Sequence, residues 1–252
     1  MNESISSNPK MPSVAAPSDL DTICVSGITP FTTIDFPGRL AGVFYLQGCP
    51  WRCRYCYNSE FWPMPPAGSQ VPKEKILQYL ESRKGHLDGI VFSGGEPTAH
   101  KMLPVWIRAV KAMGYEIGLH TAGMYPERLR EVLSLCDWVG MDIKAPFKKY
   151  ERVTQVKTDG DLARESAGLL LASGKPYEFR TTVHPDVLSE DDIQEMAREI
   201  ADMGCKHYVI QAIRPDHCPD KDLRESGNRL SGISAGLRLN LQSLFAFFQV
   251  RE

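Results

Sequence analysis

The order of hydrophobic runs and helical patterns along the chain predicts an alternating α/β protein. Six short runs rich in β-branched and aromatic residues predict strands at 40–46, 87–93, 115–121, 137–143, 177–183 and 206–212. Helical patterns separate them near 73–83, 101–113, 126–135, 161–173 and 189–202, the last with Ser189 as the expected N-cap. This alternation favours parallel strands joined by right-handed crossovers. Six units are fewer than the eight of a closed barrel, so we expect an incomplete (β/α)6 barrel of TIM type with a lateral opening.

The two ends of the chain depart from this pattern. Residues 1–22 are rich in Ser, Pro and Asn and lack the apolar core of a signal peptide, so we expect a flexible N-terminal tail before a barrel over 23–225. Residues 226–252 are expected to form a helical extension that packs on the barrel or docks a partner. Its apolar residues recur at helical spacing, at Leu237, Leu241, Leu244, Phe245 and Phe248.

Composition narrows the function classes. The chain has 252 residues, 42% of them hydrophobic, and a formal net charge of −2, which argues against nucleic acid as a partner and favours small molecules or another protein. No run of some 18 apolar residues occurs, so no membrane span is expected. Seven cysteines without a secretory segment indicate a reducing, cytoplasmic location. Four of them are scattered and are expected to be buried small hydrophobic residues, namely Cys24, Cys136, Cys205 and Cys218.

The chemically unusual segments follow the predicted strands. In parallel α/β folds the ligand lies at the carboxyl ends of the strands, so these segments should share one edge of the sheet. They are residues 49–56, 94–97, 120–123, 142–144, 182–185 and 211–215.

The first of these segments contains three cysteines, Cys49, Cys53 and Cys56, in the spacing C-x-x-x-C-x-x-C. Three thiolates this close can converge on one metal centre, and soft sulfur ligands select zinc or an iron–sulfur cluster. A structural zinc site usually has four closed ligands, and no second C-x-x-C pair occurs here. Three ligands would leave one cluster iron open, whereas a zinc-binding module without enzyme activity remains the alternative.

The cysteine spacing, with the aromatic Tyr55 just before the last cysteine, resembles the signature of radical S-adenosylmethionine (radical SAM) enzymes. Such enzymes are similar in using a partial β/α barrel with this loop after the first strand. The resemblance implies a [4Fe–4S] cluster held by Cys49, Cys53 and Cys56, with S-adenosylmethionine bound at its open iron. One electron from the reduced cluster would split a carbon–sulfur bond of this cofactor and give a 5′-deoxyadenosyl radical.

The same resemblance implies a Gly-Gly-Glu segment after the second predicted strand, and Gly94, Gly95 and Glu96 match it. Two glycines let a backbone approach a ligand closely. Exposed backbone carbonyls or the Glu96 carboxylate could then accept hydrogen bonds from the ammonium of the cofactor's methionine moiety.

Longer segments narrow the resemblance to the anaerobic ribonucleoside-triphosphate reductase activating proteins. These segments are residues 27–38, 47–53, 141–146 and 178–182, and the most specific is Thr32-Thr33-Ile34-Asp35-Phe36-Pro37-Gly38. Such activases are similar to the pyruvate formate-lyase activating enzyme and take a hydrogen atom from a glycine of a partner enzyme. The implied partners are therefore the glycyl-radical reductase and an electron donor such as flavodoxin or ferredoxin. A small-molecule radical SAM enzyme, such as a 7-carboxy-7-deazaguanine synthase-like catalyst, is the alternative.

Five more residues become candidates for cofactor binding. Asp142 and Lys144 match an Asp-x-Lys segment that in similar activases lies near the methionine carboxylate, which Lys144 could pair with. His184 and Arg214 end the fifth and sixth predicted strands and could contact the nucleoside or the substrate. His120 stands where many similar activases have Asp, and it is either a site residue or a core histidine.

A second departure from the activase pattern follows the last cysteine of the loop. Many similar activases have His at this position, where this chain has Tyr57-Asn58. Neither residue needs to be a ligand, so the cluster should stay intact.

Overall fold

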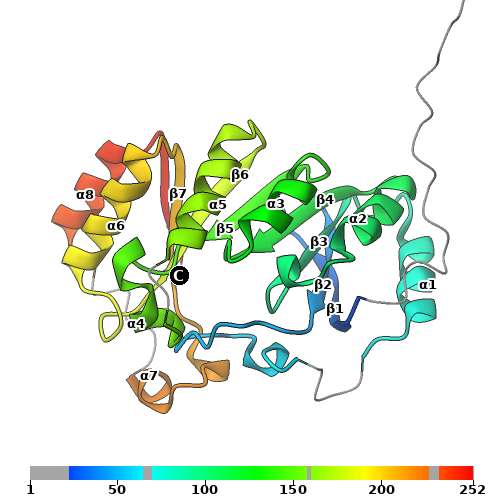
Figure 1. Cartoon of the computed structure of the whole chain (residues 1–252), viewed down its shortest axis with the longest axis horizontal. Coiled ribbons are helices and arrows are strands. Elements are labelled where there is room, and N and C mark those ends of the chain that lie inside the picture. The colour runs from blue at the N-terminus through cyan, green and yellow to red at the C-terminus, as the bar shows by residue number, and fades with distance from the viewer. Residues whose placement is uncertain (1–22, 65–69, 158–159, 227–232, 252) are drawn as a thin grey trace, which may run out of the picture.

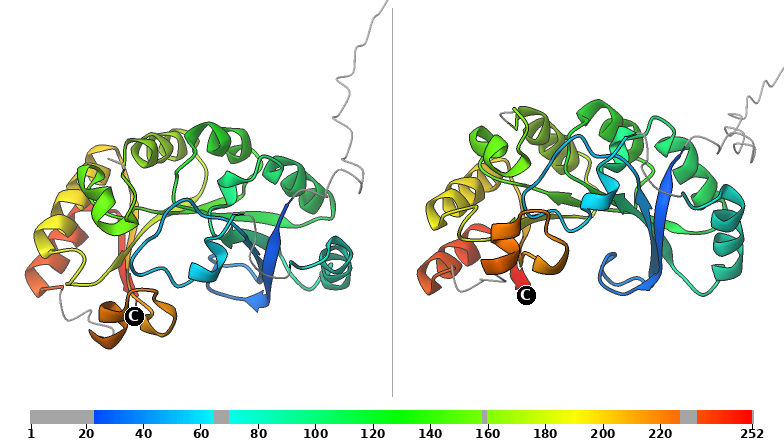
Figure 2. Two further views of the ribbon diagram at one scale, coloured as in Figure 1. Left: turned by 60° about the horizontal axis from the view of Figure 1, so that its bottom comes forward. Right: turned by 90° about the horizontal axis from the view of Figure 1, so that it is seen from below.

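The computed structural model describes residues 23–64, 70–157, 160–226 and 233–251. Its strands form one eight-stranded sheet in chain order from β1 to β8. The sheet curves into an arch with its helices on the outer side (Figures 1 and 2). Because β1 and β8 stand at opposite edges of the sheet, the barrel is incomplete and open at one side, which confirms the expected fold class.

The strands pair in a regular order. The first, β1, runs antiparallel to β2, and every later neighbouring pair is parallel. Their bounds are β1 Val25–Thr32, β2 Ala41–Leu46, β3 Gly89–Gly94, β4 Glu116–Thr121, β5 Trp138–Asp142, β6 Tyr177–Val183, β7 His207–Ala212 and β8 Phe247–Arg251. The six predicted strands correspond to β2–β7.

Helices connect the parallel strands on the outer side of the arch. The α-helices are α1 Lys73–Arg83, α2 Leu103–Ala112, α3 Pro126–Leu133, α4 Tyr150–Thr154, α5 Asp161–Ala172, α6 Glu190–Asp202, α7 Lys221–Ser226 and α8 Ala235–Leu244. Short 3₁₀ turns are η2 Ser59–Phe61, η3 Pro97–Ala99, η4 Phe147–Lys149 and η5 Pro215–His217. The five predicted helices correspond to α1, α2, α3, α5 and α6.

The start of α6 shows the local signals that made it predictable. Ser189 is its N-cap and forms a capping box with Asp192, with hydrogen bonds in both directions. Three acidic residues occupy the first turn, where the positive end of the helix dipole favours them.

The C-terminal segment corrects one expectation. Helix α8 ends at Leu244, and Phe248 lies in β8, so a continuous helix through Phe248 is wrong. The backbone turns to an extended conformation at Phe245, and the amide of Phe247 donates to the carbonyl of Lys206 at 2.9 Å. Pairing with β7 therefore outweighs the helical spacing of the apolar residues.

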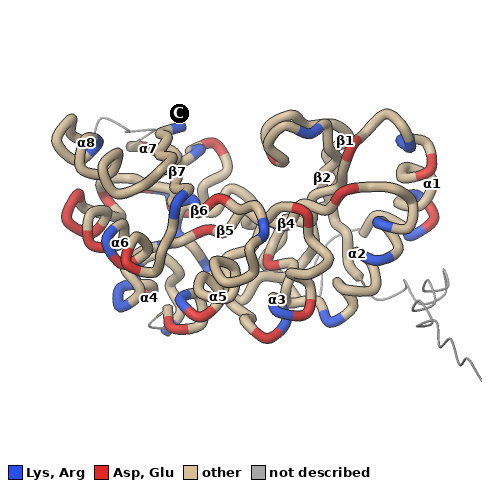
Figure 3. The backbone as a smooth tube through the Cα atoms, turned by 90° about the horizontal axis from the view of Figure 1, so that it is seen from above, with Lys and Arg blue, Asp and Glu red and all other residues tan. Residues whose placement is uncertain are grey.

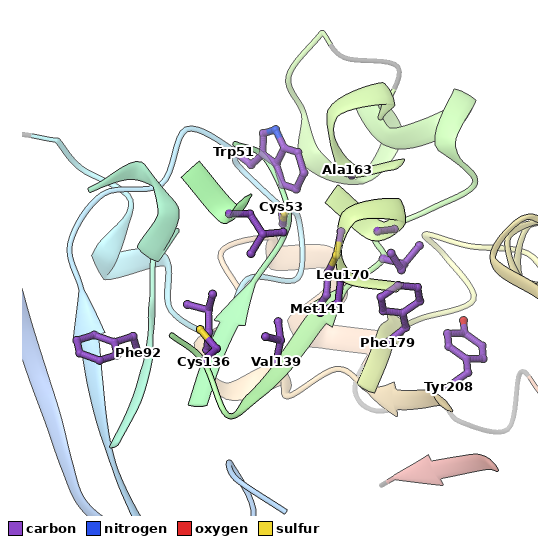
Figure 4. Packing of buried hydrophobic residues seen from close by; sticks show 14 of the residues in the cluster. Trp51, Cys53, Phe92, Cys136, Val139, Met141, Ala163, Leu170, Phe179 and Tyr208 are labelled. Atoms are coloured by element: carbon purple, nitrogen blue, oxygen red, sulfur yellow. The ribbon is translucent and has the colours of Figure 1, made fainter. Parts of the chain in front are cut away.

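The sheet buries apolar side chains on both faces. A large outer cluster packs between the strands and the helices, and Figure 4 shows part of it, including Phe92, Val139, Met141 and Phe179. A small inner cluster gathers at the amino ends of the strands around Phe36. The Phe36 ring lies against Gly89 and Gly118, where a side chain would meet it, and against Trp138 with ring centroids 5.9 Å apart. The segment around Asp35 and Phe36 therefore fills the inner side of the arch at the amino ends of the strands.

Two further expectations concern the membrane and the N-terminal tail. The described part of the chain contains no helix both long enough and apolar enough to cross a bilayer. The tail over residues 1–22 lies outside the described residues. Along the outer helices, basic and acidic residues are interspersed in the chain (Figure 3).

Candidate functional site

The cysteine loop leaves the carboxyl end of β2 and is closed at its base by hydrogen bonds. The Gln47 side chain donates to the carbonyls of Glu60 and Pro63, at 3.1 and 3.0 Å. The amides of Gly48 and Cys49 donate to the carbonyls that follow, those of Phe61 and Trp62, at 2.7 and 3.2 Å. The loop is thus a closed ring of backbone that projects from the edge of the sheet.

Contacts from later parts of the chain hold the middle of the loop. The amides of Arg52 and Arg54 donate to the carbonyls of Thr154 and Val153 at the end of α4, at 2.8 and 3.1 Å. The Arg54 side chain also pairs with Asp220, with Nε 2.7 Å from Oδ2. Its backbone carbonyl accepts from the Cys218 thiol at 3.0 Å. The loop is therefore held at its base and at its middle.

The three loop cysteines carry free thiols. Burial raises the pKa of Cys49 to about 12 and that of Cys53 to about 11, and it also raises the pKa of Cys56. At neutral pH these thiols stay protonated without a bound metal, so loading a cluster must release their protons. Of the scattered cysteines, Cys136, Cys205 and Cys218 are buried as predicted, and Cys24 is half-buried.

The two glycines after β3 allow a close approach to the cysteine loop. A side chain at Gly95 would collide with the carbonyl of Gly48, and one at Gly94 would collide with the backbone of Leu46. Gly94 also has a φ of 107°, which other residues rarely adopt. The amide of Gly95 donates to the Leu46 carbonyl at 2.8 Å, and that of Glu96 donates to the Gly48 carbonyl at 2.9 Å. The glycine pair therefore fixes the start of the loop.

Glu96 joins the ends of two strands from the inside. Its side chain is only 1% exposed. The carboxylate accepts hydrogen bonds from the amide and hydroxyl of Thr98, from the hydroxyl of Thr121 at 2.7 Å and from the amide of Ala122 at 2.8 Å. Thr121 and Ala122 come from the end of β4, so the carboxylate positions the residues 120–123 against the glycine segment.

A cluster of charges lies at the ends of β5 and β6. Asp142 accepts from Lys144 Nζ at 2.9 Å and from Arg180 Nε at 3.0 Å. Burial acts to raise the pKa of the Asp142 carboxyl, but the positive charges of Lys144 and Arg180 outweigh it and hold the pKa below its usual range. For Lys144, burial acts to lower the pKa, and Asp142 outweighs it, so this pKa is well above its usual value. Asp142 and Lys144 are therefore both ionised at neutral pH.

His120, at the end of β4, adjoins this charge cluster. Its Nε2 lies 2.8 Å from the Asp35 carbonyl and 3.5 Å from Arg180 Nη1, while Nδ1 lies 3.4 Å from the Ser93 hydroxyl. A carbonyl can only accept, so Nε2 carries the proton in this arrangement. Burial and the charge of Arg180 lower the pKa of His120 to about 4. The imidazole is therefore neutral and linked to the Asp35–Phe36 segment.

Tyr55 connects the charge cluster to the cysteine loop. Its ring centroid lies 5.7 Å from Lys144 Nζ, and burial raises the pKa of its phenol well above the usual value. The Tyr55 hydroxyl is buried, and no group in the described residues hydrogen-bonds it. A buried polar group left in this state is costly, which is consistent with a bound molecule supplying the missing partner.

His184 and Arg214 lie in different surroundings. His184 is 1% exposed; its Nδ1 accepts from the amide of Asp186 at 3.2 Å, and its Nε2 lies 3.1 Å from the Ser226 hydroxyl. Arg214 is exposed, and its guanidinium lies 5.5 Å from the centroid of the Tyr57 ring. Both ring nitrogens of His184 are thus engaged within the chain, and Arg214 is accessible to solvent.

Comparison with known protein families shows to which superfamily the chain belongs. The family model described as the radical SAM superfamily matches residues 43–200, which is more than half of the chain. This chain belongs to the radical SAM superfamily. Enzymes of this superfamily use a [4Fe–4S] cluster and S-adenosylmethionine, so these are its cofactors.

Curated relatives of this radical SAM chain include activating enzymes. A candidate glycyl-radical enzyme activating enzyme of Methanocaldococcus jannaschii is 33% identical over 208 residues, which cover 80% of this chain and 84% of the relative. The pyruvate formate-lyase-activating enzyme of Clostridium pasteurianum is 34% identical over 116 residues, covering 44% and 48%. The match thus spans about half of that second enzyme. The chain is homologous to glycyl-radical enzyme activating enzymes.

Solved radical SAM structures share the fold. SuiB of Streptococcus suis, bound to its precursor peptide SuiA, has a TM-score of 0.60 at 14% identity, covering 83% of this chain and 48% of SuiB. Methylornithine synthase has a TM-score of 0.57 at 14% identity, covering 80% and 60%. At this level of identity the likeness concerns the fold alone.

The residues of the site fit the radical SAM cofactors. Three soft sulfur donors lie on one loop, which suits a cluster that binds each thiolate at a separate iron. No three His, Cys, Asp or Glu side chains in the described ranges are arranged around a single metal ion. The buried, unpartnered hydroxyl of Tyr55 lies beside this loop, next to the charged Lys144.

Sequence reasoning missed Arg180 as a member of this radical SAM site. The segment 178–182 contributes to the family resemblance, but the resemblance does not mark Arg180. The available signal was the alternation of polar and apolar residues in β6, which places Glu178, Arg180 and Thr182 on one face. Gly140 of β5 makes room for the guanidinium, since a side chain there would come within 3.0 Å of Arg180 Cζ.

Proposed function

We propose that this radical SAM protein activates a glycyl-radical enzyme, and specifically an anaerobic ribonucleoside-triphosphate reductase. The homology to activating enzymes over 80% of the chain carries the first part of the proposal. The segment Thr32–Gly38 supports the second part, because it resembles the activators of that reductase. In the structure Phe36 of this segment belongs to the inner cluster, and the Asp35 carbonyl lies 2.8 Å from His120 Nε2, so the segment borders the interior of the site.

The open side of the arch supports a polypeptide substrate. Strands β1 and β8 end the sheet without closing it, so a loop of a partner protein can reach the carboxyl edge from the side. The substrate is a glycine in such a loop, whose Cα must lie next to the 5′-carbon of the cofactor. Holding the two reacting atoms together contributes much of the rate, because the transfer then needs no further ordering.

We assign the following roles to the chain's own residues. Cys49, Cys53 and Cys56 hold the cluster, which when reduced supplies the electron that cleaves S-adenosylmethionine. The ammonium of Lys144 pairs with the methionine carboxylate, and Asp142 holds Lys144 in place. Backbone carbonyls of the glycine segment accept from the methionine ammonium.

We assign Glu96 an indirect role in cofactor binding. Its carboxylate is buried and already accepts four hydrogen bonds from Thr98, Thr121 and Ala122. We therefore assign it to positioning the strand ends rather than to contact with the cofactor. Tyr55 and His120 line the same region, where the Tyr55 hydroxyl donates to the bound cofactor and the neutral His120 faces the substrate side. His184 and Arg214 remain predicted contacts of the nucleoside or the substrate loop.

An anaerobic assay tests this function. The reconstituted protein is incubated with S-adenosylmethionine, a reductant and a purified anaerobic ribonucleoside-triphosphate reductase. The expected result is 5′-deoxyadenosine together with a glycyl radical signal in electron paramagnetic resonance. The matched control is a reductase whose radical-site glycine is replaced by alanine, which should give no such signal.

Two other results would contradict the proposal. A glycyl signal on pyruvate formate-lyase but not on the reductase would keep the activase and change its partner. Deoxyadenosine that takes deuterium from a labelled small molecule in the absence of any partner protein would indicate a small-molecule enzyme.

A further inference from the structure

A pocket of about 290 Å³ opens beside the cysteine loop, on the flank formed by the loop and the starts of the following helices. Among the three loop cysteines, Cys49 is the one that lines it. The other lining residues include Arg52 and Trp62 from the loop, Ala99 from η3 and Tyr125 just before α3. The pocket therefore gives the outside of the molecule a short route to one of the cluster ligands.

Two arginines are stacked on aromatic rings of this pocket: Arg52 lines the pocket itself, and Arg128 lies on the ring of the lining residue Tyr125. The Arg52 guanidinium lies 5.4 Å from the centroid of the Trp62 ring, and that of Arg128 lies 4.6 Å from the Tyr125 ring. Arg52 also donates to the Cys49 and Trp51 carbonyls, and Arg128 to the Thr98 and Ala99 carbonyls. Stacking and hydrogen bonds hold both cations in fixed positions, which lowers the entropy that a partner must remove to bind them.

Within the described residues, neither Arg52 nor Arg128 forms an ion pair with a carboxylate. The acidic residues nearest in sequence are Glu60, which is exposed, and Glu127, which pairs with Arg130. Two positive charges are thus available at the pocket, in a chain whose net charge is slightly negative.

Trp62 also contacts two of the loop cysteines. The Cys49 amide donates to the Trp62 carbonyl at 3.2 Å. The Trp62 side chain also lies within hydrogen-bonding reach of the Cys56 thiol. Trp62 therefore lies between the Arg52 guanidinium at the surface and the sulfur of Cys56.

We propose that this pocket is the docking surface for an acidic one-electron donor protein, with Arg52 and Arg128 as its electrostatic anchors. The donor gives up one electron, and the oxidised cluster takes it up at the side of Cys49 and Cys56. Small, charged and weak interfaces are typical of such redox encounters, and complementary charge mainly raises the rate of association. The proposal rests on the radical SAM cofactors and is independent of the glycyl-radical partner.

The test compares a protein donor with a small one on the cluster-loaded enzyme. Purified flavodoxin, an acidic flavin protein, is mixed in its hydroquinone form with the oxidised enzyme in a stopped-flow instrument. Oxidation to the semiquinone reports the transfer of one electron. Dithionite replaces flavodoxin in a parallel series, and the dissociation constant of flavodoxin is measured as a function of salt.

We expect Arg52→Gln and Arg128→Gln each to slow reduction by flavodoxin roughly three- to tenfold at low salt, with the difference disappearing at high salt. Reduction by dithionite should not change. Arg128→Lys should recover most of the lost rate because it keeps the charge. Arg83→Gln is the matched control, because Arg83 is also stacked on a ring, 5.8 Å from that of Tyr79, but lies on α1.

Three outcomes overturn the proposal. In the first, the Arg52 and Arg128 variants accept electrons from flavodoxin as fast as the original protein. In the second, they slow equally with dithionite or lose affinity for S-adenosylmethionine, which would place the pocket in the cofactor site. In the third, the original enzyme accepts electrons from dithionite but from neither flavodoxin nor a reduced ferredoxin. None of these outcomes depends on glycyl radical formation, so the proposed function is tested separately.

Discussion

Arg180 and Asp142 form an ion pair between adjacent strands of the inner face, with Nε 3.0 Å from Oδ1. The same guanidinium reaches to 3.5 Å from His120 Nε2 on the strand beyond. Arg180 therefore links the charge cluster at the end of β5 to His120 at the end of β4. Its removal should change the ionisation of both neighbours.

We predict that Arg180→Gln raises the pKa of His120 from about 4 towards its ordinary value of 6.5, because a positive charge that disfavours the imidazolium is lost. Titration of the imidazole protons by nuclear magnetic resonance measures this directly. An unchanged midpoint would mean that burial alone lowers the pKa. Arg130→Gln, at an exposed position of α3, should leave the titration as it is.

The pH dependence of the free energy of unfolding should reflect the same shift in the pKa of His120. Because the pKa of His120 is lower in the folded state, the unfolded chain binds more protons between pH 6.5 and about 4. The contribution of His120 to stability is therefore present above this range and is lost as the pH falls through it. In urea unfolding at several pH values, the free energy of unfolding should fall less between pH 6.5 and about 4 for Arg180→Gln than for the original protein. An equal fall in both proteins would contradict the prediction.

Cys53→Ala should abolish cluster loading, because two remaining thiolates cannot hold the cluster securely. Iron and sulfide content after anaerobic reconstitution, with the visible absorbance of the cluster, provide the measurement. Cys136→Ala is the matched control, since Cys136 is also fully buried but lies far from the loop in the sequence. It should retain its iron and lose about 1–2 kcal/mol of unfolding free energy. Full iron loading of the Cys53 variant would refute the ligand assignment.

Gly95→Ala should disturb the cysteine loop, because the added methyl group collides with the Gly48 carbonyl. The loop must move at the point where it leaves β2, so we expect a clearly lower iron content and a lower affinity for S-adenosylmethionine. Gly168→Ala in helix α5 is the control, since only Met203 Cε comes within 4.0 Å of the added carbon. That change should be neutral or slightly stabilising. Equal loading in both variants would show that the loop tolerates the collision.

Glu96→Gln should destabilise the fold while leaving the cofactor chemistry possible. The amide oxygen of glutamine can still accept from Thr98 and Thr121, but its NH2 group would face the backbone amide of Ala122, so that donor loses its acceptor. The expected cost is about 1–3 kcal/mol of unfolding free energy, measured by urea denaturation. Glu127→Gln, at an exposed position, should cost less than about 0.5 kcal/mol. If the Glu96 variant keeps full stability but no longer binds S-adenosylmethionine, the side chain contacts the cofactor directly.

The sequence predicted β2–β5 because they are buried along most of their length and therefore appear as short apolar runs, whereas β6 alternates polar and apolar residues and was marked by its aromatic and β-branched side chains. The two edge strands escaped detection for different reasons. Strand β1 contains Gly27 and Pro30 and pairs irregularly with β2, and proline inside such a run argues against a strand. Strand β8 has aromatic residues that also fit a helical spacing, and only its pairing with β7 decides between the two.

Part of the candidate site was likewise predictable from the sequence, and part was not. The cysteine loop was predictable because its three cysteines lie within eight residues and their spacing is itself the signal. The surroundings of Glu96 were not, since Thr121 and Ala122 come from another strand and no local pattern marks the contact. Arg180 lies still further along the chain. Its position next to His120 depends on the register of three strands and on the small size of Gly140.

The Phe36 ring at the amino ends of the strands determines from which side the interior of the arch can be entered and left. The inner cluster around Phe36 fills the arch at the amino ends of its strands, so the interior is not open at that end. A molecule that enters the interior must therefore leave by the carboxyl edge or by the open side. Under the proposed function, release then requires the partner protein to withdraw its loop, so the dissociation rate of the complex limits how often one activase molecule can act.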